Sequence, residues 1–299
     1  MAFKLPSKFK EKWDEFLHLI NAITEKQLLT TAIVLFIVSV IVIGLSLPHY
    51  METTFNFYEN LLVEAHGMIF DILVIGILLV WLNKIGEKRI RIKRYHEEID
   101  DFRHWINEEA SFRIAGDIKR LNKDGVVAIE LYNCHLKNVN LNNVVLTGSN
   151  MNNITLEDST MQNAILNNVR LNQANIQNVK LQKANMKGSQ LSGANFSFTT
   201  LIKANLSGSN CIKAKFKGAV LIDCVLSDTM IAGADFTDAN LFKADLTNAK
   251  GLTAEQLAKS RNIYLAKMDP AIEEKLKEIA PHLYEEGAMD FSITPNTPK

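Results

Sequence analysis

Cysteine is scarce in this sequence, and its distribution excludes a disulfide framework. The 299 residues include three cysteines, Cys134, Cys211 and Cys224, and no two of them form a CxxC pair. An odd number of dispersed cysteines is not the pattern of a disulfide-stapled domain. We therefore expect three small core residues in a chain that works in a reducing compartment.

The motifs of common enzyme families are also missing. The sequence contains no GxxxxGK[ST], GxGxxG, HExxH or GxSxG motif, so it lacks the phosphate, dinucleotide, zinc-protease and hydrolase signatures. Seven histidines are dispersed along the chain. His96 and His104, eight residues apart, are expected to be a surface pair rather than metal ligands. We therefore expect no enzymatic activity, no cofactor and no metal site.

Net charge is the third absence. The formal charge at pH 7 is zero, so no global field attracts nucleic acid and none is expected as a partner. The charge is unevenly distributed, however. Apolar residues concentrate before position 83, and lysine and arginine cluster between Lys84 and Arg94.

Two long apolar runs predict a transmembrane hairpin over residues 28–83. Residues 28–47 carry no charge, and residues 65–82 carry one acid, Asp71. A helix of about 20 residues spans the roughly 30 Å of a bilayer core. Asp71, preceded by His66, is a candidate intramembrane polar site with two interpretations, ion or proton passage and helix pairing or solvation.

The flanking charges predict the orientation of this hairpin. The loop from Pro48 to Glu64 has no lysine or arginine, whereas both outer flanks are basic. The positive-inside rule then places both termini and the following domain in the cytoplasm, at the inner membrane of a bacterium. The basic run after the second span is expected to contact lipid headgroups through Lys88, Arg89, Arg91, Lys93 and Arg94.

The remaining boundaries follow from changes in pattern. We expect an amphipathic cytoplasmic segment at 1–27, linking and N-capping helices at 84–125 with the capping helix at 111–122, and C-terminal capping helices at 251–285 (252–259 and 269–279). A disordered tail is expected at 286–299. In the linking helix, apolar residues recur at heptad spacing, at Ile85, Ile92, Ile99 and Ile106. This pattern fits either a coiled-coil homo-oligomer or a helix that packs on the next domain or the membrane surface.

The strongest pattern is an apolar residue at every fifth position from Leu131 to Leu246. All 24 positions of this series are apolar, and 18 of the 24 residues found two positions later are Gly, Asn or Asp. These three residue types tolerate the positive φ that a type II turn requires. A period of five fits neither a helix nor an ordinary strand. The pattern therefore predicts a chain that turns a corner every five residues and buries its apolar sides by stacking.

The repeat resembles the pentapeptide-repeat family, whose motif is A(D/N)Lxx. The motif is matched by AlaAsnLeu at 204–206, AlaAspPhe at 234–236, AlaAsnLeu at 239–241 and AlaAspLeu at 244–246. The resemblance implies a mainly β fold, a right-handed quadrilateral β-helix of about six coils over residues 126–250. Four repeats per coil would stack residues 20 apart, with Phe196, Phe216 and Phe236 in one internal column.

Outward positions of this β-helix contain a candidate partner-binding stripe. Ile202, Ile222 and Phe242 are 20 residues apart and should stack on one outer side, with Val220 beside them, and Phe198 is a separate outward candidate. Exposed apolar residues on a rod indicate a protein partner, a second copy or the downstream helices of the same chain.

Three functions are compatible with these features. The first is a membrane-anchored scaffold or binding module for an unidentified protein. The second is an oligomeric membrane effector or pore, assembled through the hairpin or the linking helix. The third is mimicry of DNA, since some members of the family resemble B-DNA and bind DNA gyrase. Mimicry requires an acidic rod, but residues 128–250 have 8 acidic and 11 basic side chains, which disfavours it.

Overall fold

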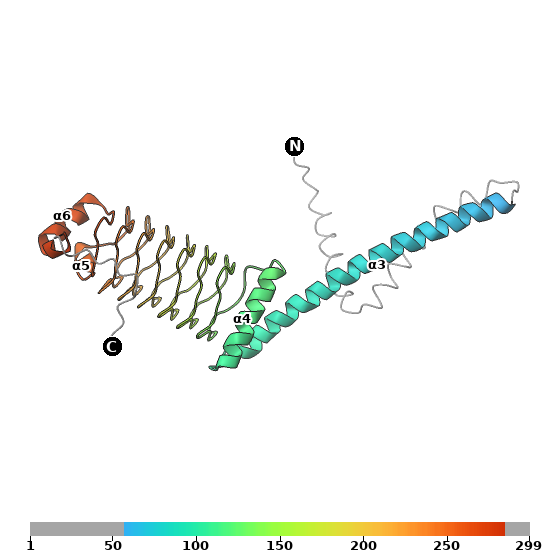
Figure 1. The fold of residues 1–299 in the computed structure, drawn as a ribbon, viewed down its shortest axis with the longest axis horizontal. Coiled ribbons are helices and arrows are strands. Elements are labelled where there is room, and N and C mark those ends of the chain that lie inside the picture. Colours follow the sequence, from blue (N-terminus) through green and yellow to red (C-terminus); the bar gives the residue numbers. More distant parts are fainter. Residues whose placement is uncertain (1–56, 285–299) are drawn as a thin grey trace, which may run out of the picture. The chain divides into compact units, whose positions relative to one another are not determined.

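The computed structural model describes residues 57–284, and the chain divides into two compact units, 1–93 and 94–299. The predicted N-terminal segment 1–27, the first predicted span 28–47 and the predicted tail 286–299 therefore lie outside the described residues. Figure 1 shows the helices and the stacked coils of the repeat domain.

Helix α3 (Phe57–Phe102) is longer than any single helix predicted for this region. Its 46 residues include the second apolar run and most of the predicted linking helix without an interruption. No proline stands between Leu82 and Ile85 to end a helix there. In the part of the chain that the structure describes, none of the helices has the length and apolar character that a bilayer crossing requires.

The end of α3 pairs with helix α4 (Glu108–Lys123). Arg113 of α4 lies 3.4 Å from Glu98 and 5.2 Å from the centre of the Phe102 ring, and Ile99 is buried. In this stretch the linking helix packs on the next domain, as one of its two interpretations predicted. The heptad prediction is wrong at Ile106, which follows the end of α3 and is 81% exposed.

Helix α4 begins earlier than predicted because Asn107, not a later residue, is its N-cap. The Asn107 carboxamide oxygen accepts a hydrogen bond from the Ala110 N–H at 2.7 Å, and Glu108 and Glu109 occupy the first turn. Both features favour a helix start, through capping and through the helix dipole. A turn with Gly125 at φ +87° follows its C-terminal end.

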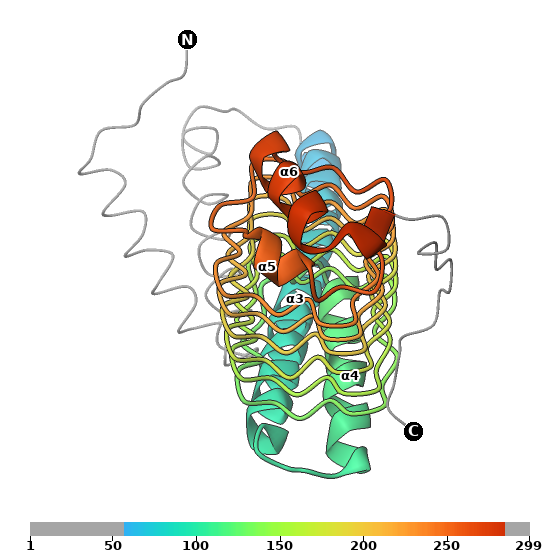
Figure 2. The same cartoon turned by 90° about the vertical axis from the view of Figure 1, so that its left-hand side faces the viewer.

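The repeat domain is a stack of coils (Figures 1 and 2). Each coil has four sides of five residues, because bridges join residues 20 apart and a corner with positive φ occurs at every fifth residue. Parallel bridges join residues 20 apart from the pair Glu130 and Asn150 to the pair Met230 and Lys250. At each coil interface the N–H of a centre residue donates to the next coil, as from Leu131 to the Asn150 carbonyl at 2.7 Å. The predicted register of four repeats per coil is confirmed.

The corners of these coils are turns with positive φ. Every residue two positions after a centre, from Asn133 to Asn248, has a φ between 54° and 73°. Six of these corner residues are neither Gly, Asn nor Asp: Gln173, Lys183, Phe198, Lys203, Lys213 and Lys243. The left-handed region costs other residue types more than glycine, so these six turns are held by the hydrogen bonds between coils.

The interior is filled by the centre residues and by the small residues two positions before them. Phe196, Phe216 and Phe236 form the predicted column, with ring centroids 5.2 and 5.3 Å apart. Small polar side chains inside the coils are hydrogen-bonded to the backbone, as in Ser159 to the Leu136 carbonyl at 2.7 Å. A close-packed interior of this kind leaves the outer sides and the two ends as the surfaces that can bind other molecules.

Side chains from the capping region replace the missing coil at the N-terminal end. Arg103 donates to the carbonyl oxygens of Glu130 and Tyr132. Ser111 donates to the His135 carbonyl at 2.9 Å, and Asn122 to the Val145 carbonyl at 2.8 Å. Corresponding carbonyls in later coils receive N–H groups from the preceding coil. The cap thus satisfies an edge that could otherwise template polymerisation.

The C-terminal end extends further than predicted. After the short helix α5 (Ala254–Leu257), bridges from Asn240 to Asn262 and from Asp245 to Lys267 continue the stack with a spacing of 22. A partial seventh coil is therefore present, offset by a two-residue insertion. Thr253 and Gln256 form a capping box at the start of α5.

Helix α6 (Pro270–Ile279) and the 3-10 helix η1 (Pro281–Tyr284) complete this end. The Asp269 carboxylate accepts the Asn248 N–H at 3.1 Å, where earlier coils use a carbonyl of the next coil. Both views place α6 at the end of the stack (Figures 1 and 2). Side-chain hydrogen bonds thus close both edges of the β-helix.

Candidate functional site

The predicted partner stripe forms one continuous column. Backbone hydrogen bonds place Ile202, Ile222 and Phe242 at the same position of successive coils, as from Lys203 N–H to the Ile222 carbonyl and from Asp223 N–H to the Phe242 carbonyl. The column continues into the partial seventh coil, where Tyr264 stacks on Phe242 with ring centroids 6.2 Å apart. The predicted stacking is confirmed, and the role of the column in partner binding stays a prediction.

Phe198, predicted as a separate outward candidate, lies at the corner that precedes this side of the coil, and its role in partner binding stays a prediction. It occupies the corner two residues before Thr200, which is itself two residues before Ile202, and its φ is +58°. A bulky residue at positive φ is uncommon. We call the set Phe198, Thr200, Ile202, Val220, Ile222 and Phe242 the apolar face.

This side of the rod changes chemistry along its length. In the first three coils the column that later carries Ile202 and Ile222 holds Asn142, Gln162 and Gln182. Asn142 accepts the Gln162 N–H at 2.8 Å, and the Gln162 carboxamide donates to Gln182 at 3.1 Å. A polar ladder thus gives way to aliphatic and aromatic side chains at the fourth coil. The chemistry of this column therefore changes between the third and the fourth coil, and its role in partner binding stays a prediction.

The burial of the apolar face is unusual for outward positions. Along one column of bridge residues, Asn140 and Lys180 are exposed, whereas Thr200 is 7% exposed and Val220 and Asn240 are fully buried. Ile222 is 9% exposed. The surface is therefore covered at Thr200, Val220 and Ile222, whereas Phe198, Ile202 and Phe242 are half-buried.

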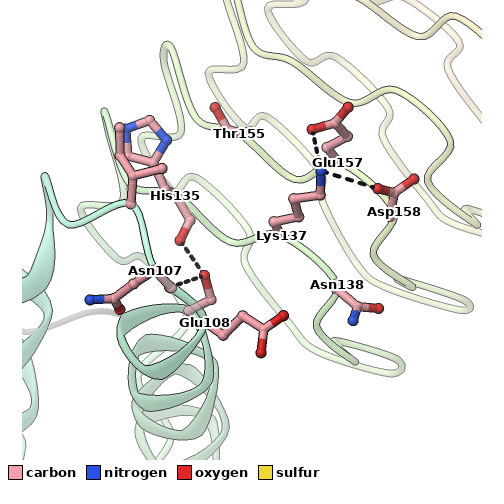
Figure 3. A pocket seen from close by; sticks show the side chains of 10 residues that line it. Asn107, Glu108, His135, Lys137, Asn138, Thr155, Glu157 and Asp158 are labelled. Atoms are coloured by element: carbon pink, nitrogen blue, oxygen red, sulfur yellow. Dashed lines mark hydrogen bonds and ion pairs between the residues drawn. The ribbon is translucent and has the colours of Figure 1, made fainter.

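A groove lies at the opposite end, between the start of α4 and the first two coils (Figure 3). Its volume is about 650 Å³. Lys137 projects into it and pairs with Glu157 at 3.2 Å and Asp158 at 3.6 Å. The hydrogen bond to Glu157 raises the pKa of Lys137, so this amine stays protonated and is no general base. The groove has mixed charge and suits polar contacts better than acid–base chemistry.

Sequence reasoning missed an exposed apolar group beside this groove. Trp105, Ile106 and Phe112 are 53%, 81% and 57% exposed. The Trp105 ring meets Phe102 edge to face at 5.1 Å. Three large apolar residues around a helix–helix turn would have been the signal, but the heptad interpretation assigned Ile106 to an interface within a helix.

The cysteines are packing residues, as predicted. All three are free and buried. Burial raises the pKa of Cys134 to about 11 and that of Cys211 to about 12. Burial, and then the nearby Cys211, raise the pKa of Cys224. Thiols held in the protonated form are poor nucleophiles and poor metal ligands. Among residues 57–284, no group of three or more metal-ligating side chains is present.

The residues predicted to meet the membrane all lie on α3. His66 and Asp71 stand in its first half, and Lys88, Arg89, Arg91, Lys93 and Arg94 follow. Lys88 and Arg89 are exposed, and Asp71 is half-buried. Arg94 lies 5.7 Å from the centre of the Tyr95 ring. Contacts of these residues with ions or headgroups stay predictions.

Comparison with known families identifies the repeat. A family model described as pentapeptide repeat region matches residues 134–211, and a second, described as pentapeptide repeats (8 copies), matches residues 209–248. Residues 134–248 form a pentapeptide-repeat domain. The predicted family and the β-helical fold are thus confirmed for this part of the chain. No curated protein sequence matches the chain.

Several solved structures are similar to the pentapeptide-repeat domain. QnrB1, a plasmid-mediated fluoroquinolone resistance protein, is 16% identical over 53% of this chain and 82% of its own, with a TM-score of 0.32. A pentapeptide repeat protein of the Arabidopsis thaliana thylakoid lumen is 26% identical over 34% and 68%, with a TM-score of 0.25. HetL from Nostoc sp. strain PCC 7120, involved in heterocyst differentiation regulation, is 22% identical over 50% and 70%, with a TM-score of 0.24.

Proposed function

We propose that this chain is a non-enzymatic scaffold whose pentapeptide-repeat domain binds a protein partner at a membrane. The observation that carries the proposal is the replacement of the polar ladder of Gln162 and Gln182 by Ile202, Ile222 and Phe242 on one side of the rod. Rigid, regularly spaced side chains on a solenoid suit recognition of another macromolecule.

The membrane tether rests on sequence. Residues 28–47 are long and uncharged enough for a bilayer crossing, and the loop that follows lacks the lysine and arginine present on both flanks. Carbonate extraction of membranes from expressing cells tests this part. The full chain should stay in the membrane pellet, and a chain lacking residues 1–83 should be released into the supernatant.

The partner contact is tested by cross-linking mass spectrometry in native membranes. A double variant, Ile202→Gln with Phe242→Gln, extends the polar ladder over the apolar face. We expect it to lose the cross-linked partner, while Gln162→Ala, a matched change in the same column, keeps it. Equal partner recovery by both variants would remove the apolar face as the contact.

A membrane effector is the second candidate function. The specific observation is that Asp71 and the capping region are joined by one helix, α3, which could transmit an event at the repeat domain to the predicted hairpin. Ion flux through liposomes that contain the full chain or Asp71→Asn tests this function. Absence of flux from both would exclude it.

A further inference from the structure

The burial of the apolar face requires a cover from outside the coils. Side chains at outward positions of a bare β-helix face solvent, as Asn140 and Lys180 do in the column that contains Val220. Yet Val220 is fully buried and Thr200 is 7% exposed. Neighbouring coils occupy only the positions above and below them, so a further chain segment must lie on the face itself.

A corner glycine gives independent support. Gly218 stands between Phe198 and Asp238 in one column of corners, where φ is positive. The corner glycines Gly148, Gly208 and Gly233 are exposed, but Gly218 is buried. The corner glycines Gly188 and Gly193 are half-buried, because Asn168 and Gln173 of the preceding coil lie against them. Gly218 is more deeply buried than any of these and has no side chain of its own, so other atoms of the chain must cover this corner.

The helices after the repeat domain lie in the wrong place for this cover. Helix α6 lies at the end of the stack in both views (Figures 1 and 2). Gln256 of α5 donates to the carbonyls of Ile231 and Ala234, which lie on another side of the coil. The cover must therefore be a segment that follows η1 or another molecule.

We propose that residues 285–299 of the same chain bind the apolar face as an extended segment. Met289, Phe291 and Ile293 alternate with Asp290, Ser292 and Thr294. An alternation with period two puts the three apolar side chains on one side of an extended chain and the polar ones on the other. Pro295 and Pro298 follow, and neither can continue a ladder of hydrogen bonds.

The length of this segment fits the distance. From the partial seventh coil back to the fourth is three coil spacings, about 14 Å at ~4.8 Å per coil. Five extended residues from Tyr284 to Met289 span about 16 Å at ~3.3 Å each. The segment is therefore long enough along the rod axis to place Met289, Phe291 and Ile293 beside the apolar face. Asn240 and Asn262, fully buried in the same column, lie on the route, and buried carboxamides suit the polar backbone of an extended segment.

This binding would make the C-terminal segment an internal competitor for the face. That consequence rests on the proposed function, because a partner that binds the face must displace the segment. The docking itself requires no partner. The two hypotheses can therefore be tested separately. Failure of the docking test would not refute partner binding, and failure of the partner test would not refute docking.

The test uses a photo-reactive benzoylphenylalanine introduced in place of Ile222 in the full chain. After irradiation, mass spectrometry should find an intramolecular link to a peptide from residues 285–299. The matched control carries the probe in place of Gln182, in the same column on the polar side, and should give no such link. Phe291→Asp should abolish the link made from position 222.

The same samples also show whether each variant is folded and whether another molecule occupies the apolar face. Each variant is accepted when its thermal unfolding midpoint matches that of the parent chain within a few degrees. A link from position 222 to another copy of the chain, to a different protein or to no peptide at all overturns the proposal. So does a link that persists unchanged in Phe291→Asp.

Discussion

The guanidinium of Arg103 lies 3.9 Å from the centre of the Tyr132 ring and donates to the Tyr132 carbonyl oxygen at 2.7 Å. One side chain thus both covers the first corner of the β-helix and supplies a donor that no preceding coil can give. Arg103 is 4% exposed and also pairs with Asp100. Arg103 therefore attaches the N-terminal cap to the first coil through hydrogen bonds.

Replacing Arg103 by leucine should destabilise the domain by about 1–3 kcal/mol, since buried carbonyls would lose their donor. Urea unfolding followed by circular dichroism measures the change. Arg113→Leu is the control, because Arg113 is half-exposed and forms ion pairs with Glu98 and Glu109 and a ring contact with Phe102. Its effect should be below about 1 kcal/mol. Size-exclusion chromatography of Arg103→Leu should also show self-association through the uncovered edge. Equal stability of Arg103→Leu and Arg113→Leu would contradict the role of Arg103 in holding the N-terminal cap.

The middle ring of the phenylalanine column should be the most sensitive core position. Phe216 contacts Phe196 and Phe236 and is fully buried. Phe216→Ala should cost about 3–5 kcal/mol, from lost burial and the cavity left in a rigid coil. Phe216→Leu keeps most of the volume and should cost less than about 1.5 kcal/mol. Chemical denaturation of the two variants decides the point, and equal losses would argue against a tightly packed column.

Two substitutions at corner positions should change the stability of the domain in opposite directions. Lys213 has a φ of +57° and is exposed, so Lys213→Gly should stabilise the domain by roughly 0.5–1 kcal/mol by removing the left-handed cost. Gly208, at φ +66° with open space around it, gives the reverse experiment. Gly208→Lys should lower the free energy of unfolding by about 1 kcal/mol. Effects of the same sign would mean that the corners are not strained.

Asp117 predicts a pH dependence of stability. Asp117 lies on the buried face of α4, and burial raises the pKa of its carboxyl although Arg120 donates to it at 2.7 Å. A raised pKa in the folded state means that the protonated acid suits the fold. The stability that the Asp117 carboxyl contributes is therefore fully present below its pKa in the unfolded chain, about 3.9. This contribution is lost as the pH rises through its pKa in the folded chain.

Asp117→Asn keeps an acceptor for Arg120 and removes the titration. The variant should have a higher melting temperature than the parent at pH 7, and the difference should shrink toward pH 4. Melting curves between pH 4 and 8 measure this convergence. A difference that stays constant with pH would show that the carboxyl does not titrate in this environment.

The five-residue rhythm was sufficient to predict the coil, the register and the phenylalanine column, because every coil repeats the same local rule. The ends could not be predicted as well. Helix α4 starts at Glu108 because Asn107 caps it, and the stack continues to Lys267 after a two-residue insertion. Neither feature repeats, so periodicity gives no information about it.

The candidate site was predicted in part. The spacing of 20 gave the column of Ile202, Ile222 and Phe242, but it did not connect Phe198 to that column. That connection depends on which corner faces which side, and it becomes visible only when the coils are stacked. The exposure of Trp105 and Ile106 depends on where α3 ends, and the apolar spacing continues past that point.

Because four repeats complete one coil, insertions can change the length of the rod without changing the direction in which its sides face. Duplicating 20 consecutive residues would add one coil, about 4.8 Å of height, and leave every side aligned with both caps. Duplicating only five would turn all later sides by a quarter of a revolution and carry Ile222 and Phe242 away from Phe198. In this architecture an insertion or deletion of four repeats changes only the length of the rod. An insertion or deletion of one repeat changes the direction in which the following side chains point.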